Sequence, residues 1–123
     1  MTIAQVLRRI DEVQPSSEDR EQMIRWLRDL DEEIYTDVIC KHEGWEAVAP
    51  PDYTEETDEE RELLVPDRWG DMYVHWLQSK IDFNLQEYAR FNNSSAAFQS
   101  EMMDYRCWYN REHMPLRTRG HYH

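Results

Sequence analysis

Cysteine and glycine are both scarce in this chain of 123 residues. The two cysteines, Cys40 and Cys107, lie far apart and in no metal-binding or redox spacing, which excludes a disulfide framework and a cysteine metal site. We therefore expect reduced thiols, packed as small hydrophobic side chains in a cytosolic protein. The three glycines, Gly44, Gly70 and Gly120, are isolated from one another, so there is no glycine-rich phosphate-binding loop.

Long apolar runs are also missing. No stretch of 18 or more apolar residues occurs, which excludes a helix that spans a membrane. The start of the chain is amphipathic, carries Asp11 and Glu12, and lacks the compact apolar stretch of a signal peptide. We therefore expect neither a secretion signal nor contact with a membrane.

Basic residues are few compared with acidic ones. The chain has 14 lysines and arginines against 26 aspartates and glutamates, a formal net charge of −12. This balance argues against nucleic-acid binding through neutralised phosphates, which needs a basic face. A small protein this acidic repels DNA, imitates it or docks onto basic protein surfaces.

What the sequence does contain is helical periodicity. Thr2 and Gln5 form a capping-box pattern, and apolar residues follow at helical spacing through 3–13. A second amphipathic helix is expected over 16–43, ended by Gly44 in a left-handed conformation. With the aromatic region near the C-terminus, the pattern predicts a mainly α fold, a small bundle of about four helices.

We expect one helical domain over 1–114 and an extended C-terminal tail over 115–123. An acidic excursion, here called the acidic segment (44–66), follows the second helix. From Glu43 to Asp67 there are ten carboxylates against one basic residue, Arg61, a local net charge of −9. Apolar fragments at both ends of this segment leave two interpretations open, an irregular acidic loop and a short β-hairpin.

The aromatic region carries an apolar stripe over 77–109 in alternating steps of four and three residues. Four poor helix formers at 92–95 interrupt it without changing its phase. We favour a break near Asn92 and Asn93, where Asn93 or Ser94 caps a new helix. The alternative is one continuous helix over 67–113.

No group of side chains indicates a reaction. The carboxylates of 52–62 lack the alternating ligands of a calcium loop and are more simply a solvated, self-repelling loop. The histidines form no zinc motif, and His121 and His123 would lack a fixed third ligand. We therefore predict no catalytic, cofactor-binding or metal-ligating residue, and a protein that is not an enzyme.

Aromatic residues lie on more than one helix face, which leaves two interpretations open. They form a single internal core, or some of them contact a neighbouring subunit. The candidates for a subunit interface are Trp69, Tyr73, Trp76, Trp108 and Tyr109.

The C-terminal tail is the one net-positive end of the chain. It is a disordered terminus or a docking peptide that becomes ordered on a partner. The candidate docking residues are Pro115, Leu116, Arg117, Thr118, Arg119, Gly120, His121, Tyr122 and His123.

Residues 63–115 resemble the head–tail connector (adaptor) proteins of tailed phages. The most specific parts are the stretches IDFNLQEYARFNNS and WYNREHMP. The resemblance implies a mainly helical virion subunit that forms a ring, most often of twelve copies, beneath the portal protein. It also implies a location in the neck between head and tail, after assembly in the host cytoplasm.

The same resemblance implies the partners. These are the portal protein, neighbouring copies in the ring, and further tail or stopper proteins. The tail 115–123 would grip the portal, and DNA would pass through the ring without specific binding. An acidic loop over 52–62 is compatible with lining such a channel.

A second hypothesis comes from the charge alone. A small acidic protein can mimic DNA and inhibit a nucleic-acid-binding enzyme, with the carboxylates of 52–62 in place of phosphates. Such mimics spread their charge over a large face, whereas this chain concentrates it in one segment. The connector hypothesis is therefore preferred.

Overall fold

The computed structural model describes residues 1–15, 18–57 and 59–116. The α-helices are α1 (Ile3–Val13), α2 (Arg20–Asp37), α3 (Asp71–Asn84) and α4 (Tyr88–Glu112). Three short 3₁₀ turns lie at Ile39–Lys41, Trp45–Ala47 and Asp67–Trp69. The described residues contain no β-strand, and the prediction of a mainly helical bundle of about four helices is confirmed.

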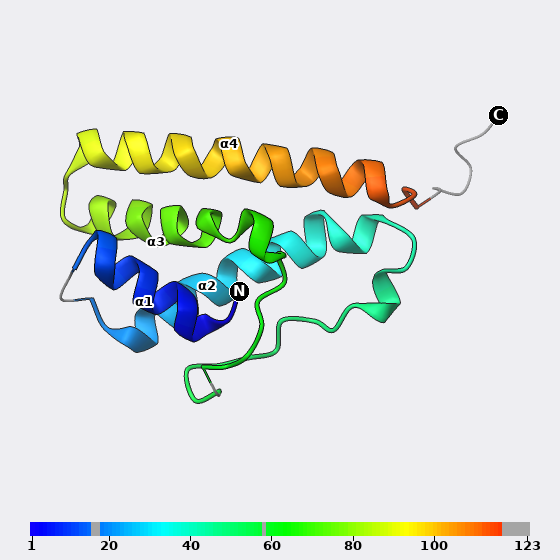
Figure 1. Cartoon of the computed structure of the whole chain (residues 1–123), viewed down its shortest axis with the longest axis horizontal. Coiled ribbons are helices and arrows are strands. Elements are labelled where there is room, and N and C mark those ends of the chain that lie inside the picture. The colour runs from blue at the N-terminus through cyan, green and yellow to red at the C-terminus, as the bar shows by residue number, and fades with distance from the viewer. Residues whose placement is uncertain (16–17, 58, 117–123) are drawn as a thin grey trace.

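Helices α3 and α4 form an antiparallel hairpin, which packs closely along its length (Figure 1). Helices α1 and α2 lie on the other side of α3 from α4, and both contact α3. Helix α4 therefore forms an outer layer that packs mainly on α3. The acidic segment runs along the face of the molecule farthest from α4 (Figure 1).

The predicted ends of the first two helices are confirmed in part. The capping box forms, since the Gln5 amide donates to Thr2 Oγ1 and the Thr2 amide donates to Gln5 Oε1. The α-helical part of α2 ends earlier than expected, at Asp37, and the 3₁₀ turn carries helical backbone on to Lys41. Gly44 follows with φ of 87°, the left-handed conformation predicted for it.

The acidic segment forms no β-hairpin, so that interpretation is wrong. Its N-terminal fragment folds into the 3₁₀ turn Trp45–Ala47, and its C-terminal fragment pairs with the start of the chain instead. The Ile3 amide donates to the Arg61 carbonyl at 3.1 Å, and the Ala4 amide donates to the Glu59 carbonyl at 2.8 Å. Helix α1 has amides at its first turn without internal partners, and the segment supplies the carbonyls that satisfy them.

The predicted break at 92–95 is also wrong, because α4 continues through it as one helix of 25 residues. Asn92 and Asn93 face outward, and the buried Ser94 hydroxyl contacts the carbonyl of Arg90 four residues earlier. Four such residues cost a helix only about 2 kcal/mol relative to alanine, which packing on α3 offsets.

The true break lies between Asn84 and Tyr88, where α3 ends in a Schellman motif. The Glu87 amide donates to the Asp82 carbonyl, and the Gln86 amide donates to the Phe83 carbonyl. The motif places Gln86 at φ of 60°, a left-handed position that glycine usually occupies. Since no glycine or proline marks this turn, the sequence pattern gave no indication of it.

The core is one continuous cluster of buried side chains. Each α-helix contributes to it, and the acidic segment adds Tyr53, Leu63 and Val65. This segment is therefore partly folded into the core and is not a wholly solvated loop, as its composition had indicated.

Candidate interaction surfaces

The turn between α3 and α4, here called the hairpin end (83–88), exposes large apolar side chains. Phe83, Leu85 and Tyr88 are 56%, 57% and 56% exposed. Phe83 contacts the rings of Tyr88 and Phe91 at centroid distances of 6.3 and 5.4 Å. Side chains of this size gathered at one tip are typical of a contact surface.

An apolar groove begins at the hairpin end and continues between α3 and α4 on the side of α2. Its volume is about 400 Å³. Its lining residues are Trp26, Trp76, Ser79, Lys80, Phe83, Asn84, Phe91, Ser95, Phe98 and Gln99. The Lys80 ammonium lies 4.4 Å from the centre of the Trp76 ring, and the Trp76 indole N–H donates to the Trp26 carbonyl at 2.9 Å.

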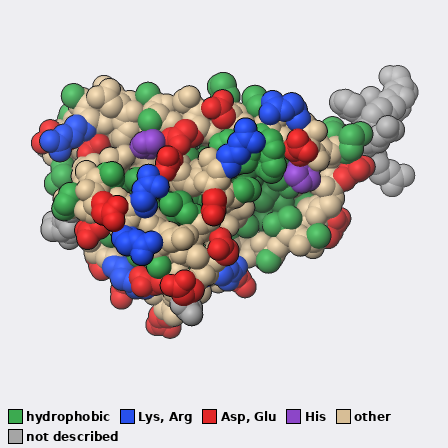
Figure 2. All heavy atoms as spheres, viewed as in Figure 1, with side chains coloured by type: hydrophobic (Ala, Val, Ile, Leu, Met, Phe, Trp, Pro, Cys, Tyr) green, Lys and Arg blue, Asp and Glu red, His purple; other side chains and the backbone are tan. Residues whose placement is uncertain are grey.

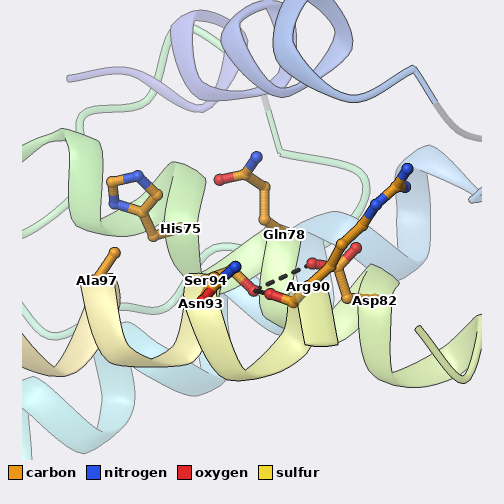
Figure 3. A pocket seen from close by; sticks show the side chains of 7 residues that line it. All are labelled: His75, Gln78, Asp82, Arg90, Asn93, Ser94 and Ala97. Atoms are coloured by element: carbon orange, nitrogen blue, oxygen red, sulfur yellow. Dashed lines mark hydrogen bonds between the residues drawn. The ribbon is translucent and has the colours of Figure 1, made fainter. Parts of the chain in front are cut away.

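A polar groove of about 280 Å³ lies between the same two helices. Figure 3 shows its lining residues, His75, Gln78 and Asp82 from α3 and Arg90, Asn93, Ser94 and Ala97 from α4. The Ser94 hydroxyl donates to Asp82 Oδ2 at 3.1 Å, and the side-chain Nε2 of Gln14 donates to Asp82 Oδ1 at 2.7 Å. Asp82 is therefore a buried carboxylate with polar partners from the C-terminal cap of α1 and from α4.

The polar groove does not join its serine, histidine and aspartate into a relay. Among the described residues, His75 Nδ1 contacts the Glu101 carboxylate, while the Ser94 hydroxyl contacts Asp82. A nucleophilic serine needs a base within hydrogen-bonding reach, and these contacts direct Ser94 toward a carboxylate that already accepts another bond. The side chains of the polar groove are best described as polar contacts between α3 and α4.

The acidic segment is held to the rest of the chain by ion pairs. Glu55 contacts Arg25 and Glu59 contacts Arg20, both on α2, whereas Asp52 and Arg61 pair within the segment. The lower part of Figure 2 shows acidic and basic side chains interspersed on the surface. In addition, Glu62 and Asp67 both contact the amino group of Met1. About half of the carboxylates that made this segment conspicuous thus have cationic partners, which leaves less free negative charge than the sequence indicated.

A buried carboxylate fastens the acidic segment to two helices. Asp31 on α2 is fully buried and accepts a hydrogen bond from the Tyr73 hydroxyl on α3 at 2.6 Å. It also accepts bonds from the Tyr53 hydroxyl at 2.9 Å and from the Leu64 amide at 3.3 Å. The Tyr73 hydroxyl in turn accepts the Val65 amide at 2.9 Å.

Burial dominates the electrostatics of this network. It raises the pKa of Asp31 to about 6, although the hydrogen bonds from the two tyrosines favour the ionised form. It also raises the pKa of Tyr53 and Tyr73 above the usual range, so both hydroxyls stay protonated as donors. Sequence reasoning missed this network because Asp31 sits in a run of charged residues, where a helix normally faces water.

Three of the five aromatic candidates for a subunit interface lie inside the chain's own core. Tyr73 is completely buried, and Trp69 and Tyr109 are nearly so. For these three, the expectation of an interface with another subunit gives way to a role in the core. Trp76 and Trp108 are half-buried, and Trp76 lines the apolar groove.

The start of the C-terminal tail is attached to residues 41–43, at the end of the 3₁₀ turn that follows α2. The Glu43 amide donates to the Met114 carbonyl at 2.7 Å, and the Leu116 amide donates to the Lys41 carbonyl at 2.9 Å. Pro115 forms an isolated bridge with His42 between these two bonds. The rest of the candidate docking tail, residues 117–123, lies outside the described residues.

The structure also gives the positions of potential metal ligands and of the two thiols. No group of three or more histidine, cysteine or acidic side chains in the described chain is arranged to hold a metal ion. His121 and His123 lie outside that part. Both cysteines are free, but Cys107 is exposed and not packed as predicted, while Cys40 is partly buried.

Two further findings bear on the class of protein. Within the described ranges, no helix is both long and apolar enough to cross a membrane. Comparison with known proteins gave no match, whether to a protein-family profile, to a curated sequence or to a solved structure.

Proposed function

We propose that this protein is a structural assembly subunit of the head–tail connector type. In this role, copies form a ring that docks on a portal protein in the virion neck and surrounds passing DNA. The sequence resemblance over 63–115 supports the proposal. The fold is compatible with it, because a helical body with exposed apolar ends offers contact surfaces at both ends of α4.

One observation carries the proposal, namely that the residues leading into the tail are held in a fixed position. Main-chain bonds hold residues 114–116 beside 41–43, at the end of α4. Leu116 therefore has a defined place in the structure, and Arg117, Arg119 and Tyr122 follow it in the sequence. A short basic segment that contains an aromatic residue has a composition suited to docking into a partner subunit.

The main-chain bonds of residues 114–116 define where to truncate the chain. Removing 117–123 keeps the bonds of Glu43 and Leu116, so the body should fold as before. We expect the truncated chain to lose binding to portal rings encoded with it, measured by co-sedimentation. A matched control, Arg106→Ala, removes an exposed arginine of α4 and should bind as the full chain does. Undiminished binding of the truncated chain would refute the tail as the docking element.

The DNA-mimic hypothesis has less support. A mimic presents free carboxylates spaced like phosphates, whereas Asp52, Glu55 and Glu59 are each paired with an arginine. A capture experiment with nucleases and polymerases would favour this hypothesis if capture were lost on neutralising Glu55, Glu56, Asp58, Glu59 and Glu60.

A further inference from the structure

The apolar groove has an unusual charge for this protein. Among its ten lining residues, Lys80 is the one charged side chain, although acidic residues outnumber basic ones in the chain by 26 to 14. Five of the lining residues are aromatic, namely Trp26, Trp76, Phe83, Phe91 and Phe98. The groove is therefore matched to an apolar group that carries a negative charge beside it.

The hairpin end has the complementary composition. Leu85 and Tyr88 are apolar and exposed, and Glu87, also exposed, lies between them in the chain. Neither Lys80 nor Glu87 forms an ion pair with another described residue. Within one chain, both the cation of the groove and the anion of the turn are available to a partner.

The two surfaces are also continuous, because Phe83 belongs to both. A second copy that places its hairpin end in the groove of the first can then receive the hairpin end of the first in its own groove. Such a contact is reciprocal and has two-fold symmetry, the commonest form of self-association. It also places Lys80, the one charged residue that lines the groove, opposite Glu87 of the other copy.

The conformation of the turn fits a surface that must present fixed side chains. Gln86 holds φ of 60° in a Schellman motif, a conformation that costs a non-glycine residue about 1 kcal/mol. The motif's two main-chain hydrogen bonds fix the direction in which Leu85 and Glu87 leave the backbone. Less conformational entropy is then lost when these side chains meet a partner.

We propose that two copies of this chain associate through their hairpin ends. Leu85 and Tyr88 of each copy enter the apolar groove of the other, and Glu87 of each pairs with Lys80 of the other. The contact is distinct from portal docking and does not rest on the proposed function. The two are tested separately, because the truncation of 117–123 leaves the hairpin end intact.

Sedimentation of the full chain over about 1 µM to 1 mM tests the proposal. We expect a reversible equilibrium between one and two copies. The double variant Leu85→Ser/Tyr88→Ser should weaken it by at least about tenfold. The matched control Met103→Ser, which alters a side chain that is 67% exposed elsewhere on α4, should leave it unchanged. Circular dichroism and the unfolding midpoint check that each variant is folded.

A charge exchange tests the pairing itself. Lys80→Glu and Glu87→Lys should each weaken association by about fivefold or more, and the double variant should restore it to within about twofold. A wild-type chain that remains monomeric over the whole concentration range would overturn the proposal, and the groove would then be a site for a different protein. Association that survives the Leu85 and Tyr88 changes, or a double variant that restores nothing, would overturn it equally.

Discussion

The acidic segment and the hairpin end are both connections between helices, but they relate to the core in opposite ways. The longer, highly charged connection buries Tyr53 and Val65 almost completely and is tied down by ion pairs and main-chain bonds. The short connection between two regular helices leaves Phe83, Leu85 and Tyr88 more than half exposed. Contacts made by individual side chains, rather than the length or charge of a connection, decide which of the two is anchored.

The largest effect is expected from Tyr53, which anchors the acidic segment. Tyr53→Ala removes a buried ring and a donor to Asp31, and should lower the free energy of unfolding by about 3–5 kcal/mol. Tyr53→Phe keeps the ring and should cost only about 1 kcal/mol. Urea unfolding measures both. If alanine cost no more than phenylalanine, the ring would not be an anchor.

The next effect is a dependence of stability on pH through Asp31. Its folded pKa of about 6 exceeds the ordinary value of 3.8, so the folded state binds more protons between these limits. Its contribution to stability is therefore fully present below about pH 4 and is lost as pH rises through 6, by up to about 3 kcal/mol.

Comparison with Asp31→Asn isolates this contribution. Asp52, whose pKa Arg61 lowers, acts in the opposite sense at lower pH and is common to both proteins. When unfolding midpoints are plotted against pH, the curves of wild type and variant should therefore be parallel below pH 4. Between pH 4 and 6, the midpoint of wild type should fall relative to that of the variant. Parallel curves over that range would contradict the assignment to Asp31.

At the hairpin end, changing the backbone should matter more than changing the exposed side chains. Gln86→Gly relieves the left-handed conformation and should raise the free energy of unfolding by about 0.5–1 kcal/mol. Thermal unfolding measures this gain. As a control, glycine in place of the exposed helical residue Gln99 should destabilise by a similar amount.

The smallest effect is expected from Leu85→Ser/Tyr88→Ser on the single chain. Because both side chains are exposed, stability measured at low protein concentration should stay within about 0.5 kcal/mol of wild type. A much larger loss would show that the hairpin end belongs to the core, and the contrast with the acidic segment would disappear.

Much of the fold could be predicted from local patterns. The capping box at Thr2 and the left-handed Gly44 depend on neighbouring residues alone, and both were predicted correctly. The helix break was misplaced because asparagine and serine at 92–95 look like caps, whereas packing on α3 overrides their weak preferences. The real turn depends on Gln86 in a conformation for which glutamine carries no signal.

The candidate surfaces were harder to predict, because they depend on contacts between distant residues. Nothing near Asp31 in the chain indicates that two tyrosines, 22 and 42 residues further on, donate to it. The periodicity of the aromatic region likewise could not separate Tyr73, which is fully buried, from Trp76 on the groove. Helical spacing gives a face, and tertiary packing decides what covers it.

The bonds between the first turn of α1 and residues 59–61 also bear on the order in which the chain folds. Helices α3 and α4 are adjacent in sequence, so their hairpin forms with little loss of loop entropy. The start of α1 obtains its hydrogen-bond acceptors only when a stretch more than fifty residues away arrives. We therefore expect the C-terminal hairpin to consolidate first and the amino end of the chain to be among the last parts to become fixed.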